Sequence, residues 1–266
     1  MTGMDNDRCV IVEVGNSVTE LALLEGESCL ARERVPTAGL QGADDVRRVI
    51  DSFSGLRSGL RSAAVSSVVP RLTALFVDLL SVRLEGDVLE ISSALDLPFR
   101  FEYFPRTSIG ADRLALLAFG AGRASGRAVI VVDLGTAVTI DVLDRNATYR
   151  GGMILPGIDL QRAALHERTA RLPLVDIGSD VPLLGRSTEE CIRSGILYGC
   201  ARQVDGLIGD IRSTLPVSHG KDEPLVVVTG GSSRIIAPML HCLHETDEHA
   251  VLKGAALLLE LNRTGR

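Results

Sequence analysis

Two eight-residue stretches decide the fold that this sequence predicts: Val12-Glu13-Val14-Gly15-Asn16-Ser17-Val18-Thr19 and Val132-Asp133-Leu134-Gly135-Thr136-Ala137-Val138-Thr139. Aligned residue by residue, each has an acidic residue near the end of an apolar run, a glycine two positions later, and then an amide or hydroxyl residue. A short apolar run that stops at a glycine and resumes a few residues later is typical of a β-hairpin. Because the pattern occurs twice and similar elements surround it, we predict a duplicated α/β unit with a cleft between the copies.

The elements around the two hairpins support the duplication. In chain order, strands are expected at Cys9–Val14, Glu20–Leu24, Ser28–Val35, Ala63–Val65, Val88–Ile91, Arg127–Asp133, Val138–Leu143, Thr148–Met153 and Leu225–Val228. Helices are expected at Asp44–Phe53, Leu72–Arg83, Gly110–Gly122, Leu160–Leu172, Thr188–Leu215, Ser233–Cys242 and Ala250–Leu261. A weak seam at Ala124-Ser-Gly126 divides the chain into two predicted domains, 1–123 and 124–266.

Composition restricts the classes of partner. The 266 residues are 45% hydrophobic, enough for a substantial core, and the formal net charge is -6. Nucleic acid and anionic membranes favour basic surfaces, so neither is expected as a partner. No apolar stretch reaches the ~18 residues of a membrane span. The N-terminus is polar and acidic, unlike a signal peptide, and the five cysteines are scattered, so we expect a cytoplasmic protein with reduced thiols.

The two hairpins have the chemistry of phosphate binding. A glycine lets backbone N–H groups approach an anion, and the hydroxyls of Ser17, Thr19, Thr136 and Thr139 would add donors. A carboxylate cannot face phosphate directly, so Glu13 and Asp133 would act through a cation such as Mg²⁺ or its water shell. For either hairpin alone, a plain turn is the alternative; the paired occurrence favours a nucleotide held from both sides.

Two further motifs are candidates. Gly110-Ala-Asp-Arg113 opens a helix, where Asp112 could accept the proton of an attacking hydroxyl and Arg113 could hold a substrate carboxylate. The alternative is an Asp that caps the helix beside a surface Arg. Thr229-Gly-Gly231 lies between a strand and a helix, where backbone can pack flat against a ligand ring, or where it forms only a tight turn.

In the order of its motifs the chain resembles the type III pantothenate kinases of the acetate kinase, sugar kinase, Hsp70 and actin superfamily. The matching blocks are Glu13–Thr19, Ser66-Ser-Val-Val-Pro70, Tyr103 with Gly110–Arg113, Asp133–Ala137 with Thr139, Gly151–Gly157, Thr188 with Ser194-Gly195, Thr229–Gly231 and Leu252-Lys-Gly254. The resemblance implies duplicated ribonuclease H-like (actin-like ATPase) domains with a ligand cleft between them. It also implies ATP-dependent phosphorylation of the primary hydroxyl of pantothenate, the first step towards coenzyme A.

The resemblance also implies roles for single residues. Asp112 corresponds to the general base. Pantothenate contacts are implied at Tyr103, Gly110, Arg113 and Thr188; phosphate contacts at Gly15, Asn16, Ser17, Gly135 and Thr136; and an adenine platform at Gly230 and Gly231. The implied cofactors are ATP, Mg²⁺ and a monovalent cation, K⁺ or NH₄⁺, with Asp133 in the cation-rich region. The family's homodimeric state implies a substrate site near a subunit interface.

This chain departs from the family's pattern near the phosphates. Glu13 replaces the usual Asp, Ser17 and Val138 stand where Thr is usual, and Arg106 occupies the expected position of a proline. These departures leave two alternatives to a pantothenate kinase: a diverged kinase for another small hydroxy acid, and a non-catalytic sensor of nucleotide or pantothenate. A chaperone or filament protein of the superfamily is disfavoured because the chain is too short for the extra subdomains.

Overall fold

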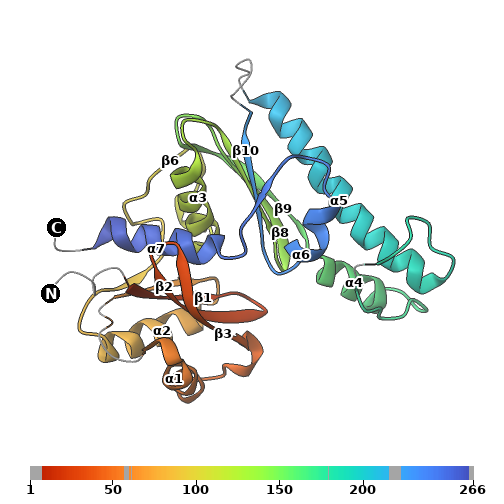
Figure 1. The fold of residues 1–266 in the computed structure, drawn as a ribbon. Helices are drawn as coiled ribbons and strands as arrows, with labels where there is room; N and C mark the ends of the chain where they lie inside the picture. Colours follow the sequence, from red (N-terminus) through yellow and green to blue (C-terminus); the bar gives the residue numbers. More distant parts are fainter. Residues whose placement is uncertain (1–7, 57–59, 61, 179, 216–222, 264–266) are drawn as a thin grey trace. The chain divides into compact units, whose positions relative to one another are not determined.

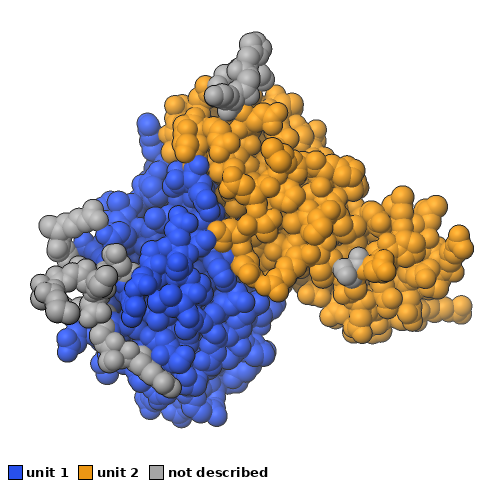
Figure 2. All heavy atoms as spheres, in the orientation of Figure 1, with its two compact units in different colours: residues 1–123, 249–266 blue, residues 124–248 orange. Residues whose placement is uncertain are grey.

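The computed structural model describes residues 8–56, 60, 62–178, 180–215 and 223–263. The acidic N-terminal segment 1–7 thus lies outside the described residues. The chain forms two compact units (Figures 1 and 2). Unit 1 comprises residues 1–123 and 249–266, and unit 2 comprises residues 124–248.

Unit 1 is built on a mixed sheet with the strand order β3-β2-β1-β4-β5. Its strands are β1 (Arg8–Val14), β2 (Val18–Glu25), β3 (Ser28–Pro36), β4 (Ala63–Ser67) and β5 (Val88–Glu90), followed in the chain by the short β6 (Arg100–Phe101). The first three strands pair antiparallel, whereas β4 lies parallel to both β1 and β5. This arrangement confirms the three consecutive strands that the sequence predicts at the first hairpin.

Helices cover both faces of the unit 1 sheet, as Figure 1 shows. They are α1 (Ala43–Ser52), α2 (Pro70–Arg83), α3 (Ala111–Arg123) and α7 (Ala250–Asn262). Val10, Val12 and Val14 are buried on the face that packs against α1 and α2. Side chains alternate along a strand, so Ile11 and Glu13 point to the other face, where α3 and α7 pack.

The last helix belongs to unit 1, although the predicted second domain extended to residue 266. Helix α7 packs against α3, and both contact β4. The contact is very close: a Cβ on Gly254 would lie 1.8 Å from the carbonyl oxygen of Ala115. The final segment therefore groups with the first unit because its apolar face is buried there, a contact that a linear boundary at Ala124 does not reveal.

Unit 2 contains the second copy of the strand pattern. Its strands are β7 (Val129–Leu134), β8 (Ala137–Leu143), β9 (Thr148–Pro156), β10 (Leu225–Thr229) and β11 (Glu245–Thr246), in the order β11-β10-β7-β8-β9. Its helices are α4 (Ile158–Glu167), α5 (Thr188–Thr214) and α6 (Ser233–Ile236). The apolar side of β7 and β8 forms one core with α5 and α6. Strands β7 and β10 are parallel, as β1 and β4 are in unit 1.

The helix expected over Ser233–Cys242 is shorter in the structure. Helix α6 ends at Ile236 and a 3₁₀ turn follows over Ala237–Met239. Pro238 lacks an N–H and cannot continue the α-helical ladder, which explains the change. None of the helices in the described ranges is both long and apolar enough to cross a membrane.

The close approach of α7 to α3 is testable through Gly254. We expect Gly254→Ala to lower the free energy of unfolding by about 1–3 kcal/mol, because its Cβ would overlap the Ala115 backbone. Urea denaturation followed by circular dichroism measures this change.

The matched control is Gly209→Ala in α5, where a Cβ meets nothing within 4 Å. Alanine is the better helix former, so this variant should be unchanged or more stable by about 0.5–1 kcal/mol. Equal stability losses in the two variants would contradict the packing argument.

Candidate active site

The turn of the first hairpin is stabilised by hydrogen bonds within the hairpin and from Thr37. The N–H of Gly15 donates to the carbonyl of Val18 at 3.0 Å. Thr37 supports the turn twice: its N–H donates to Ser17 O at 3.0 Å, and its hydroxyl donates to Gly15 O at 2.8 Å. The side chains of Asn16 and Ser17 remain exposed. The turn is thus preorganised, and two of its polar side chains lie at the surface.

Thr19 differs from its expected role. It lies opposite Val14 across the hairpin, on the side of the sheet that faces the core, and it is fully buried. Its hydroxyl shares a hydrogen bond of 2.9 Å with the hydroxyl of Thr37. Thr19 therefore stabilises the turn from the buried face of the sheet, through Thr37. Its side chain does not lie at the exposed tip of the turn.

Glu13 sits in a row of polar residues across the sheet. It lies opposite Glu20 on β2 and beside Ser66 on β4. Directly opposed carboxylates repel each other, and this repulsion is offset by the guanidinium groups of Arg34 and Arg32, whose Nε atoms lie 3.0 and 3.6 Å from Glu20. The Ser66 hydroxyl is buried and has no hydrogen-bond partner in the described part of the chain.

Asp133 occupies the corresponding place in unit 2. It lies between Thr139 on β8 and Thr229 on β10. The hydroxyl of Thr139 is buried without a hydrogen-bond partner among the described residues. Both carboxylates thus have a buried, unsatisfied hydroxyl on a neighbouring strand. Such a hydroxyl is costly unless something else binds it, which makes it an indication of a ligand site.

The two hairpins differ by one residue in the turn. In the first, Val14 pairs with Thr19 and Glu13 with Glu20; in the second, Asp133 pairs with Thr139. The residue-by-residue alignment therefore holds up to the turn and then shifts by one. Since a shift of one residue exchanges the faces of a strand, Thr139 corresponds in space to Glu20 and not to Thr19.

Two glycines let backbone approach the Asp133 turn closely. A Cβ on Gly230 would lie 2.3 Å from Asp133 Oδ1, and Gly230 has a φ of +95°. A Cβ on Gly157 would lie 2.3 Å from the carbonyl oxygen of Gly135. Gly231 is open, with nothing within 4 Å of its Cβ position. The structure thus brings together Asp133, Gly135, Thr136, Thr139 and Gly230 around one end of β7.

Asp112 and Arg113 lie in the first turn of α3. The Arg113 N–H donates to Asp112 Oδ1 at 2.7 Å, and a Cβ on Gly110 would be 2.4 Å from that oxygen. The same Cβ would lie 3.5 Å from Val68, whose N–H donates to the carbonyl of Val14 at the end of β1. Asp112 therefore lies at the same end of the unit 1 sheet as the Glu13 turn.

Arg113 is not a surface residue, because only 7% of it is exposed. A guanidinium stays charged at any ordinary pH, and burying it is costly without an anionic or hydrogen-bonding partner. The alternative of a helix-capping Asp beside a surface Arg does not describe this pair. A half-buried carboxylate that accepts from the backbone N–H of a buried arginine suits a site that takes a proton.

The remaining substrate candidates lie outside these groups. Tyr103 is half-buried and precedes the exposed Phe104 in the loop before α3. Thr188 is exposed at the first turn of α5, where the side chain of Ser187 accepts a hydrogen bond from Glu190 N at 3.2 Å. Tyr103 belongs to unit 1 and Thr188 to unit 2. That Tyr103 and Thr188 contact the same substrate molecule stays a prediction.

The groups near the two turns that could bind a cation are carboxylates and hydroxyls. Over the described ranges, no three His, Cys, Asp or Glu residues group into a metal site. Mg²⁺ keeps most of its waters and takes one or two protein carboxylates, so Glu13 and Asp133 are compatible with it. The structure also places Glu20 and Ser66 next to Glu13, and Thr229 next to Asp133. The sequence motifs gave these three residues no role at the candidate site. Ser66 was visible only as part of the Ser66–Pro70 block.

Solved structures show the class of fold. The chain matches a protein from Campylobacter jejuni assigned to the Baf family of transcriptional activators, with a TM-score of 0.58 and 19% identity over 94% of this chain and 97% of that one. It matches a ROK hexokinase from Thermus thermophilus with a TM-score of 0.50 and 13% identity, over 96% and 99% of the two chains. The fold is the mixed α/β fold of actin-like ATPases and sugar kinases, which confirms the predicted class.

Sequence relatives narrow the class to a family. A model of the type III pantothenate kinases matches residues 9–210. A type III pantothenate kinase from Chlorobaculum tepidum is 43% identical over 95% of this chain and 94% of its own length. One from Rubrobacter xylanophilus is 36% identical over 94% and 97% of the two chains. The chain belongs to the type III pantothenate kinase family, so the resemblance seen in its motifs is confirmed.

The Asp133 turn can be tested through Gly230. We expect Gly230→Ala to lower the free energy of unfolding by about 1–3 kcal/mol, because the new Cβ would meet the Asp133 carboxylate at a φ that alanine rarely adopts. Chemical denaturation measures the change. Gly199→Ala in α5, where a Cβ meets nothing within 4 Å, is the control and should keep full stability. A Gly230→Ala protein as stable as this control would contradict the described approach.

Proposed function

We propose that this chain transfers the γ-phosphoryl group of ATP to the primary hydroxyl of pantothenate, giving 4′-phosphopantothenate in the first step of coenzyme A biosynthesis. Family membership over nearly the full length supports this activity. The observation that carries it is the Asp112–Arg113 pair at the end of the sheet that holds the first turn: the half-buried Asp112 carboxylate accepts from the backbone N–H of Arg113, whose side chain is buried.

Asp112 is the general base of the proposed reaction. Its carboxylate would accept the proton of the pantothenate hydroxyl as that oxygen attacks the γ-phosphorus. The Arg113 N–H already donates to Asp112 Oδ1, which fixes the orientation of the carboxylate. The Arg113 guanidinium would bind the pantothenate carboxylate, with Tyr103, Gly110 and Thr188 as further contacts. Holding the substrate by its anionic end keeps the hydroxyl in place for attack.

The two turns are the proposed phosphate grips. Gly15, Asn16 and Ser17 in unit 1, and Gly135 and Thr136 in unit 2, would donate to phosphate oxygens. Thr139 would add its unsatisfied hydroxyl. Gly230 and Gly231 would pack against the adenine. Preorganised donors of this kind stabilise the charge of the transition state without reorganising during the reaction.

Glu13 and Asp133 are the proposed residues for cations. Mg²⁺, when bound, supplies positive charge that neutralises the phosphates. Membership of this kinase family implies that the chain uses ATP and a divalent metal. A monovalent cation, K⁺ or NH₄⁺, near Asp133 is a further part of the proposal. A cytoplasmic location stays a prediction from the sequence.

A homodimer is proposed as the active form. Thr188 is exposed, and the loop just before it carries Leu183 and Leu184, which are 64% and 82% exposed. This loop is fixed to α5, because the hydroxyl of Ser194 donates to Leu183 O at 2.5 Å. Large apolar side chains on an ordered loop are typical of an interface. A second copy covering this loop would place the substrate site near the interface.

The role of Asp112 is tested with Asp112→Asn. Without the base, we expect kcat for phosphopantothenate formation to fall ~10²–10⁴-fold with little change in the KM for ATP. A coupled assay with ATP, Mg²⁺ and K⁺ measures both. Asp78→Asn, which alters an exposed carboxylate on α2, is the control. Full turnover by Asp112→Asn would remove Asp112 from the mechanism.

Substitutions of Glu13 and a substrate panel distinguish an active pantothenate kinase from a non-catalytic sensor and from a diverged kinase. If Glu13 acts through Mg²⁺, Glu13→Gln should lower kcat/KM for ATP by roughly 10- to 100-fold, and higher Mg²⁺ should partly restore it. Glu85→Gln, at an exposed position, should change nothing. An unmodified protein without turnover that Glu13→Asp restores would favour the non-catalytic sensor. A panel of hydroxy acids in which another substrate exceeds pantothenate would favour a diverged kinase.

The proposed dimer is tested with Leu184→Asp. A charge in a desolvated interface is costly, so this variant should be a monomer where the unmodified protein has twice the monomer mass by light scattering. Val82→Asp is the control, because Val82 is 90% exposed in unit 1 and should leave the mass unchanged. A monomeric unmodified protein would contradict the proposal.

A further inference from the structure

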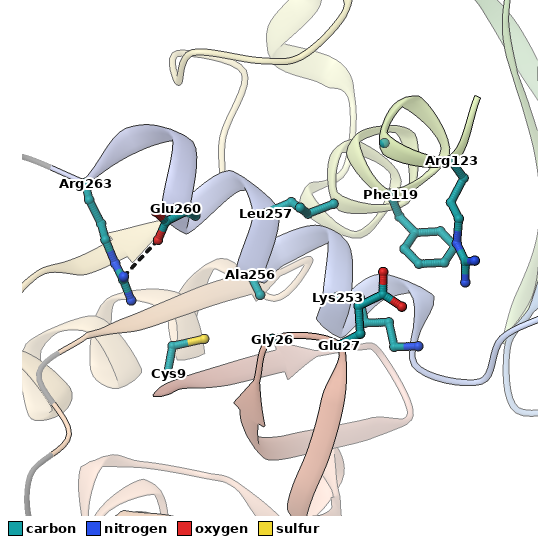
Figure 3. Close-up of a pocket in the computed structure, with 11 residues that line it drawn as sticks. Cys9, Gly26, Glu27, Phe119, Arg123, Lys253, Ala256, Leu257, Glu260 and Arg263 are labelled. Atoms are coloured by element: carbon teal, nitrogen blue, oxygen red, sulfur yellow. Dashed lines mark hydrogen bonds and ion pairs between the residues drawn. The ribbon is translucent and has the colours of Figure 1, made fainter. Parts of the chain in front are cut away.

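A cavity in unit 1 lies apart from every residue assigned to phosphate or pantothenate. It has a volume of about 420 Å³, within the usual range of ~300–1,000 Å³ for small-molecule sites. Its walls are the start of β1, the turn between β2 and β3, the last turns of α3 and one face of α7 (Figure 3). All these elements belong to unit 1.

Part of the cavity lining is apolar. It is formed by Phe119 from α3, by Ala256 and Leu257 from α7, and by the thiol of Cys9. Burial raises the pKa of the Cys9 thiol to about 11, so at neutral pH this wall is uncharged. Two glycines, Gly26 and Gly122, contribute no side chain and leave the space between these walls open.

The other lining residues are charged and their sum is positive. Arg123, Lys253 and Arg263 are three cations, and Glu27 and Glu260 are two carboxylates. Glu260 accepts from Arg263 Nη1 at 2.8 Å, so these two lining residues are paired with each other. The guanidinium carbon of Arg123 lies 5.1 Å from the centre of the Phe119 ring, an arrangement that orients its donors beside the apolar wall.

We propose that this cavity is a binding site for a small organic anion: a carboxylate with a compact apolar or aromatic body. The apolar body would occupy the space against Phe119, Ala256 and Leu257. The carboxylate would accept from Arg123 and Lys253 at the positive rim, where a charge-assisted hydrogen bond is strongest. Neither half of such a ligand would suffice alone, which gives the site its selectivity.

The cavity is separate from the proposed kinase site within the same unit. Asp112 lies in the first turn of α3 and Arg123 is its last residue. At ~1.5 Å per residue, these two positions are roughly 16 Å apart along the helix. A ligand in the cavity is therefore not expected to compete with pantothenate at Arg113.

The experiment uses a matched pair of probes, 3-phenylpropionate and 3-phenylpropylamine, which differ in the sign of their charge. Both are titrated calorimetrically into the full-length protein saturated with pantothenate, so that a carboxylate site at Arg113 is already filled. We expect the acid to bind at least 10-fold more tightly than the amine. Equal affinity, or no binding of the acid, would overturn the proposal. The readout is independent of turnover, so its failure is distinguishable from failure of the proposed kinase activity.

Two kinds of variant locate the binding. Arg123→Gln should weaken binding of the acid by roughly 10- to 100-fold, whereas Arg100→Gln, at an exposed position elsewhere in unit 1, should not. Ala256→Phe should fill the cavity and abolish binding. Gly122→Leu is the second filling variant, because its Cβ would meet only Leu257 at 3.5 Å. A folded filling variant that still binds the acid normally would overturn the proposal.

Discussion

The parallel pairing of two strands in each unit is the constraint on which the rest of the structure depends. β1 lies beside β4 in unit 1, and β7 lies beside β10 in unit 2. This pairing places Glu13 next to Ser66 and Asp133 next to Thr229, at the ends of the strands where the chain turns. Ligands of open α/β sheets bind at such strand ends. The acidic residues, the turns proposed to bind phosphate and the proposed base on α3 all lie near these strand ends.

Close backbone contacts surround these strand ends. Gly230 and Gly157 allow two loops to touch the Asp133 turn, and Gly254 allows α7 to lie against α3. Both ends of α3 lie at a candidate site. The first turn of α3 carries Asp112 near the end of β1, and its last turn forms a cavity with α7. The same helix packing thus supports the proposed active site and encloses the second candidate site.

Much of this was predictable because its signals are local in the sequence. The hairpins, most of the strands and the long helix from Thr188 follow from apolar periodicity and turn residues. The motif order was enough to identify the family, as the relatives confirm. The end of α6 was missed, although Pro238 in the sequence marks it.

By itself, the sequence determined the duplicated pattern, the fold class, the family and the chemical types of the site residues. Only the tertiary structure decided how those residues pair. A one-residue difference in turn length reversed the face of Thr19, so that it holds Thr37 while Thr139 lies beside the acidic residue. Burial of Arg113, and the position of a Ser66 hydroxyl that has no partner among the described residues, likewise depend on distant strands and helices. Strand register and burial are set by contacts between segments far apart in the chain, and no local pattern encodes them.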